Sequence, residues 1–143
     1  MKFSDFDSIT WEENRQYYDT CLIPFTGLTG SEGPAETVLA LEKLRDFMDM
    51  VEKPFRGRIV TYPVLQYRGE HFIDLINELC RNVKSLNFRY AIVLTAELEI
   101  TRDELNESDL VLSLPNFRDL GTKDVQALTS EKIQELWMEG VPL

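Results

Sequence analysis

Apolar runs of about strand length alternate with longer segments in which apolar residues recur at helical spacing. The runs are TCLIPF (20–25), RIVTY (58–62), YAIVLT (90–95) and DLVLSL (109–114). Runs that are apolar almost throughout favour strands buried on both faces, and Pro24 is expected near the end of the first. Strands alternating with helices predict βαβ units, and therefore a mainly parallel sheet with right-handed crossovers.

The first long helix is expected over residues 34–52, where apolar residues recur every three or four positions. Pro34 suits its first turn, and Pro54 and Gly57 end it. The stripe predicted to face the core consists of Val38, Leu41, Leu44, Phe47, Met48 and Val51.

Further helices are predicted from periodicity and from capping signals. The two longer ones cover residues 70–86 and 130–139. A short helix over residues 11–17 would be capped by Thr10, with Glu13 completing a capping box. Residues 101–104 (TRDE) match the same box and predict a helix of one or two turns.

These elements predict a single α/β domain over residues 1–143, a three-layer sandwich of Rossmann-like or flavodoxin-like type. Its four-stranded sheet is expected in the order second, first, third, fourth strand. This order puts residues 20–25 near the centre and a topological switch point between the first and third strands. Residues 64–69 (VLQYRG) fit either a prolonged second strand or a loop.

Charge and cysteine content narrow the choice of partners and compartment. The net charge of −10 disfavours binding to nucleic acid or to an anionic membrane, which would both repel the protein. Cys21 and Cys80 lie in apolar surroundings without metal-ligand spacing, which indicates reduced, buried thiols in a cytoplasmic protein, and a disulfide between them is the alternative. The first residues lack the apolar region of a signal peptide, and no apolar run has the length of a membrane span.

The glycine-rich stretch after the first strand is the first candidate site. Ligands of open α/β sheets bind outside the carboxyl ends of the strands, and residues 26–33 (TGLTGSEG) lie there. The glycines match neither the dinucleotide fingerprint nor the phosphate loop, and Glu32 opposes an anion. The stretch is therefore either a flexible connection or an anion site built from backbone amides and hydroxyl groups.

Other candidates follow the third and fourth strands. Glu97 with Glu99 could act as an acid/base pair, and Arg118 beside Asn116 could hold a carboxylate or phosphate. The predicted ligand-binding set is Thr26, Gly27, Thr29, Gly30, Ser31, Glu97, Asn116 and Arg118. No catalytic residue, metal or cofactor is predicted, and the motifs that would indicate an enzyme are missing.

The C-terminal segment LWMEGVPL is apolar enough to bury against something. Its apolar residues are Trp137, Met138, Val141 and Leu143. They could dock on the protein's own core, or could bind a protein partner or a second copy of the chain.

The order of several segments resembles a known family. Trp11, the run YYDTCLIPF (17–25), a short polar loop, a long helix and ESDLVLSLP (107–115) are similar to the uncharacterised YpiF-like family of Bacillus-type Firmicutes. The resemblance implies a small cytoplasmic bacterial protein. It implies no activity and no catalytic residue.

Two functional hypotheses follow. The first is a non-catalytic interaction or regulatory protein, suggested by the acidic composition, the missing catalytic motifs and the apolar C-terminus. The alternative is a small-molecule or nucleotide-binding domain, which could be an enzyme, with its site around residues 27–33, Glu97, Asn116 and Arg118.

Overall fold

The computed structural model describes residues 1–140 and contains the α/β sandwich that the sequence predicts. In these residues a parallel sheet has the order β2-β1-β4-β5, and β3 also pairs with β1. The strands are β1 (Thr20–Leu28), β2 (Ile59–Thr61), β3 (Leu65–Tyr67), β4 (Tyr90–Thr95) and β5 (Leu110–Ser113). The four predicted strands are β1, β2, β4 and β5, so the predicted order is confirmed.

Strand β1 is longer than predicted and continues well past Pro24. On one side it pairs with β4 as far as Phe25, while on the other it pairs with β2 as far as Leu22 and with β3 from Phe25 onwards. Pro24 thus falls between the β2 and β3 ladders, where its missing N–H breaks no hydrogen bond. The open question about residues 64–69 is answered by β3, a short strand beyond an irregular register.

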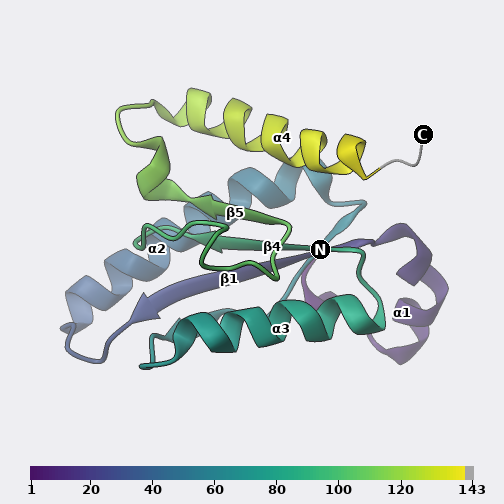
Figure 1. Cartoon of the computed structure of the whole chain (residues 1–143), viewed down its shortest axis with the longest axis horizontal. Coiled ribbons are helices and arrows are strands. Elements are labelled where there is room, and N and C mark those ends of the chain that lie inside the picture. Colours follow the sequence, from purple (N-terminus) through teal and green to yellow (C-terminus); the bar gives the residue numbers. More distant parts are fainter. Residues whose placement is uncertain (141–143) are drawn as a thin grey trace.

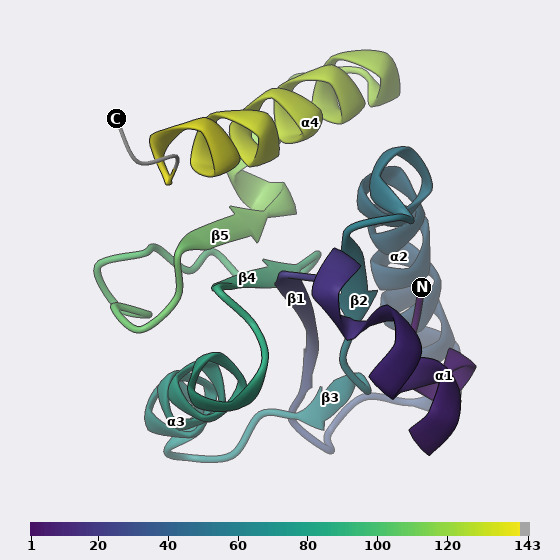
Figure 2. The same ribbon diagram turned by 90° about the vertical axis from the view of Figure 1, so that its right-hand side faces the viewer.

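Helices cover both faces of the sheet (Figures 1 and 2). Helices α2 (Pro34–Glu52) and α4 (Thr122–Glu139) lie on one face, and α3 (Phe72–Leu86) lies on the other with the N-terminal segment that contains α1 (Ser8–Asn14). Side chains of β1 alternate between the two cores. Leu22 packs beneath α2 and α4, whereas Cys21 and Ile23 face α3.

Three helix predictions were wrong in detail. Helix α1 starts earlier than predicted, because the Asp7 carboxylate caps it and accepts the Thr10 N–H at 2.8 Å. Helix α4 starts at Thr122, well before the predicted residue 130. Residues 101–104 form turns: the Glu104 carboxylate still accepts the Thr101 N–H at 3.2 Å, but the chain bends to bury Leu105.

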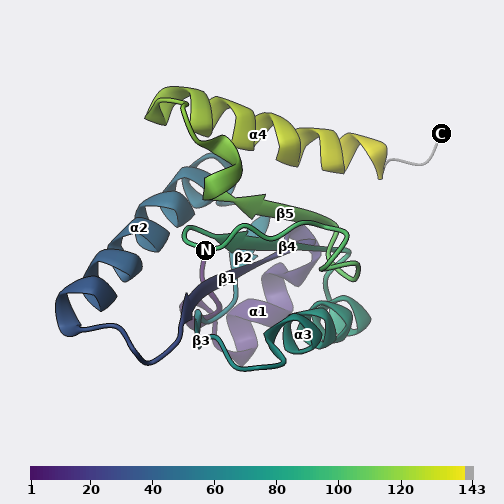
Figure 3. The same cartoon turned by 60° about the vertical axis from the view of Figure 1, so that its left-hand side comes forward.

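The predicted stripe of α2 is also only partly buried. Val38 and Leu41 are 52% and 36% exposed. The buried face consists of the other predicted residues, Leu44, Phe47, Met48 and Val51, together with Ala40 and Glu52. The amino-terminal half of α2 projects beyond the ends of β4 and β5 (Figure 3).

Trp137 anchors the end of α4 to the sheet. Its indole Nε1 donates a hydrogen bond to Thr20 Oγ1 at 2.9 Å, and the Arg58 guanidinium stacks 4.0 Å from the ring centroid. Arg58 in turn binds both carboxylate oxygens of Asp19, each at 2.9 Å. Trp137 is therefore part of the protein's own core, while Met138 is 75% exposed. Val141 and Leu143 lie outside the described residues.

Candidate functional site

A hollow lies at the topological switch point, between the carboxyl ends of β1 and β4. This strand-end pocket has a volume of about 320 Å³. The sequence rule for open α/β sheets predicts a site at this place. The pocket is lined by Thr26, Gly27, Leu28, Glu32, Glu36, Leu39, Ala40, Lys43, Arg68, Glu97 and Leu98.

The glycine loop beside the pocket already holds an anion, which is its own Glu32. The Glu32 carboxylate accepts the N–H groups of Thr29 and Gly30, each at 2.9 Å, and the Thr29 hydroxyl at 3.1 Å. The Thr29 and Ser31 hydroxyl oxygens lie 2.7 Å apart. These hydrogen bonds, that of the Thr29 N–H first, lower the pKa of Glu32 to about 2. The loop amides are thus occupied in this conformation.

Thr26 and Gly27 form the floor of the pocket. The Thr26 side chain is buried, and its hydroxyl donates to Gln66 Oε1 on β3 at 2.8 Å. Gly27 has a φ of +82°, and a Cβ there would lie 2.7 Å from Leu98 Cδ1. Only glycine therefore fits the close approach of β1 to the segment that follows β4.

Two cations reach the pocket from α2 and from the end of β3. Lys43 Nζ lies 3.5 Å from a Glu97 carboxylate oxygen, which makes a loose, half-exposed ion pair. Arg68 is partly buried, and its guanidinium has no hydrogen-bond or ion-pair partner within residues 1–140. Arg68 is the group best placed to bind an anionic ligand.

The remaining predicted residues lie outside this pocket. Arg118 donates to the Pro115 carbonyl and pairs with Glu99 at 3.0 Å, on the exposed surface after β5. Asn116 is exposed next to it. The structure thus gathers Thr26, Gly27 and Glu97 around one pocket, while Thr29, Gly30 and Ser31 form the adjacent loop.

Lys43 and Arg68 were missed as site residues in the sequence. Arg68 lies in the segment whose structure the sequence left open, and Lys43 lies outside the apolar stripe predicted for its helix. A signal for Arg68 was present, because residues that follow strands in such sheets line the ligand crevice. Lys43 could be found only from the projection of α2 past the sheet.

The two thiols lie far from such chemistry. Cys21 and Cys80 are both free and buried. Burial raises the pKa of both thiols, in the case of Cys80 to about 11, so they are protonated at neutral pH.

The part of the chain that the structure describes contains neither a cluster of metal ligands nor a helix that could span a membrane. No three His, Cys, Asp or Glu side chains gather there as metal ligands would. None of its helices combines the length and apolar character that crossing a membrane requires.

Comparison with known proteins gives a family. No curated protein and no solved structure matches the chain. One family matches residues 9–138 and thus most of the sequence. The chain therefore belongs to the family described as "Protein of unknown function (DUF2487)".

Proposed function

We propose that this protein is a non-catalytic interaction or regulatory domain that binds a basic, amphipathic segment of a partner protein on α2. The observation that carries the proposal is the exposure of Val38 and Leu41 on the projecting half of that helix. Apolar side chains at helical spacing are normally buried, and their exposure beside polar groups is typical of an interaction surface.

Charge supports a basic partner. Glu42 and Asp49 continue the stripe of Val38 and Leu41 along α2, and neither has an ion-pair partner in the described chain. Arg45 lies between them, but its guanidinium binds the neighbouring Asp46 at 3.2 Å. The whole molecule carries a net charge of −10. A partner segment with apolar and basic side chains would complement both features.

The C-terminal end is the competing surface. Of the four apolar residues predicted there, Trp137 is buried and Met138 is exposed, so within residues 1–140 a contact at this end would use Met138. Binding of a protein partner or of a second copy of the chain at Met138 is the alternative to binding on α2.

Affinity capture with charge-matched variants separates these surfaces. Val38→Lys with Leu41→Lys keeps helix propensity but removes the apolar contact and repels a basic partner. The control is Ile9→Lys with Tyr17→Lys, which changes two exposed apolar residues that are not part of α2. We expect the double α2 variant to capture at least tenfold less of a partner protein than wild type and the control variant capture. High salt should weaken the binding of that partner to wild type and to the control. Equal capture by all variants contradicts the proposal, whereas loss only in Met138→Lys moves the contact to the C-terminus.

A second function is supported by the strand-end pocket: binding of a small anionic molecule through Arg68. Leu28, Leu39 and Leu98 give the pocket apolar walls, and Arg68 is its unpaired cation. We expect a carboxylate, sugar phosphate or nucleotide to raise the melting temperature of wild type. A ligand at 100 times its Kd should stabilise the protein by about 2.7 kcal/mol. Arg68→Gln should abolish the shift, while Arg56→Gln, outside the pocket, should keep it. If no compound in a broad panel of anions raises the melting temperature of wild type or of Arg56→Gln, this function is contradicted.

The source and compartment are part of the proposal. The segments 17–25 and 107–115 support a relation to the YpiF-like proteins of Bacillus-type Firmicutes. The two buried, free thiols support a reducing, cytoplasmic setting.

A further inference from the structure

A second hollow lies at the opposite end of the sheet from the glycine loop. This aromatic pocket has a volume of about 340 Å³, and its lining residues come from the N-terminal segment with α1, from β2 and from the turn that joins α3 to β4. It shares no lining residue with the strand-end pocket and none with α2. Its function is therefore independent of the functions proposed above.

Four of the eight residues that line it are aromatic. The Trp11 ring centroid lies 5.2 Å from Phe6 and 5.8 Å from Phe88, and Phe3 stacks on Phe88 at 5.8 Å. Val60, buried in β2, also contributes. Since these rings pack against one another, the pocket is held open by rigid groups rather than by long flexible side chains.

The electrostatics of the pocket favour a cation. Asp7 is the one ionisable residue that lines it, so no lysine, arginine or histidine of the described chain contributes a positive charge. Thr10 donates its N–H and its hydroxyl to Asp7 Oδ1, at 2.8 and 2.9 Å, and these hydrogen bonds, that of the N–H first, lower the pKa of Asp7. The negative faces of aromatic rings attract cations as well.

We infer that the aromatic pocket binds an organic cation, a quaternary or N-alkylated ammonium group. Alkyl groups on nitrogen spread the positive charge over an apolar surface that fits against rings, and the charge lies near Asp7. A hydrated metal ion lacks such a surface, and an anion meets both the carboxylate and the ring faces.

Choline and its neutral isostere 3,3-dimethylbutan-1-ol test this inference by NMR. The two tryptophan indole N–H signals provide an internal control, because Trp11 lines the pocket and Trp137 is buried between α4 and the sheet. We expect choline to shift the Trp11 signal in a saturable manner, and the neutral isostere to bind at least tenfold more weakly. The Trp137 signal should not move. Comparable binding of the neutral compound, or no saturable shift of Trp11, overturns the inference.

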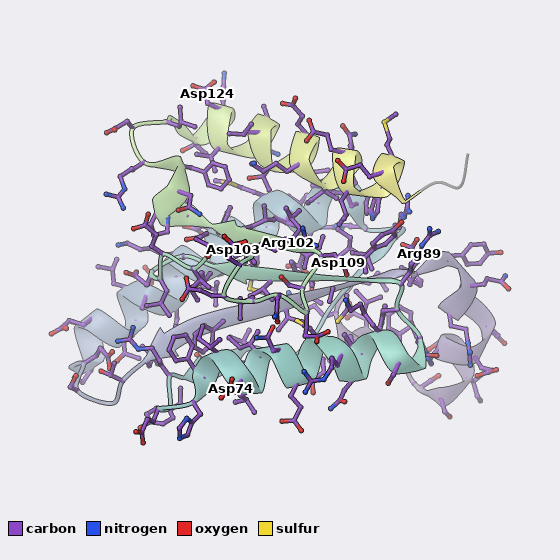
Figure 4. The ribbon with its side chains drawn as sticks, in the orientation of Figure 1. Asp74, Arg89, Arg102, Asp103, Asp109 and Asp124 are labelled. Carbon is purple, nitrogen blue, oxygen red and sulfur yellow. The ribbon has the colours of Figure 1, made fainter. Side chains whose placement is uncertain are left out.

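The contribution of Asp7 is tested by Asp7→Asn. Asparagine caps helices as well as aspartate does, so α1 should persist while the charge is lost. The charge-matched control is Asp124→Asn at the start of α4, in the opposite outer layer (Figure 4). We expect choline affinity to fall at least threefold in Asp7→Asn and to stay unchanged in Asp124→Asn. If Asp7→Asn binds choline as tightly as wild type does, the charge of Asp7 plays no role. The neutral isostere is the folding control: equal, weak binding of it to Asp7→Asn and to Asp124→Asn shows that the pocket is intact in both.

Discussion

Gly27 and Gly30 both have positive φ angles but differ in their surroundings. A Cβ on Gly27 would lie 2.7 Å from Leu98 Cδ1, whereas a Cβ on Gly30 would meet its nearest atom, Tyr67 Cε2, at 3.9 Å. We expect Gly30→Ala to lower the free energy of unfolding by about 1 kcal/mol, from backbone strain alone. Gly27→Ala adds steric overlap and should cost about 2–3 kcal/mol.

Urea unfolding measures both effects as shifts of the midpoint at constant slope. The variant Leu98→Ala provides the control. It removes the overlapping methyl groups, so Gly27→Ala should be less costly in that background. Equal costs of the two glycine substitutions in the wild-type background would show that the contact with Leu98 does not matter.

The glycine loop as an element should respond to acid through Glu32. The folded-state pKa of Glu32 is about 2, below its ordinary value of 4.5. A lowered folded pKa means that the carboxylate contributes to loop order above pH 4.5, and that this contribution is lost as the pH falls towards 2. We expect the NMR amide shifts of Thr29 and Gly30 to stay constant from neutral pH down to about pH 3.5. Glu32→Gln should change both shifts already at neutral pH. A titration midpoint near 4.5 would contradict the observed hydrogen bonds.

The same element shows what a sequence can and cannot reveal. Glu32 was expected to oppose an anion in the loop, and the structure shows the more specific reason: its own carboxylate occupies the amides. Residues 101–104 show the converse, since the hydrogen bond from Thr101 to Glu104 forms without the helix it predicts. Local signals specify local hydrogen bonds, but burial of distant residues such as Leu105 decides which element follows.

On the scale of the whole molecule, the strand order and the position of the strand-end pocket were predictable. The order was chosen because it puts the first strand near the centre, and the position of the pocket follows from the switch point that this order creates. The exposure of Val38 and Leu41 was not predictable. Apolar periodicity identifies which face of a helix is apolar, but it does not reveal how far the sheet extends along that face. The position of Arg68 at the pocket was not predictable either, because it follows β3. This strand is short, and it pairs with β1 only beyond an irregular register.

The central position of β1 has a consequence for how the chain folds. β1 pairs residue 20 with residue 59 on one side and with residue 90 on the other. During synthesis, the apolar segment TCLIPF thus leaves the ribosome long before its β4 partner exists. Parallel ladders of this kind close late, and an unpaired apolar strand is prone to aggregate in the meantime. The chaperones that meet the nascent chain should therefore bind first at this segment, which the finished sheet hides completely.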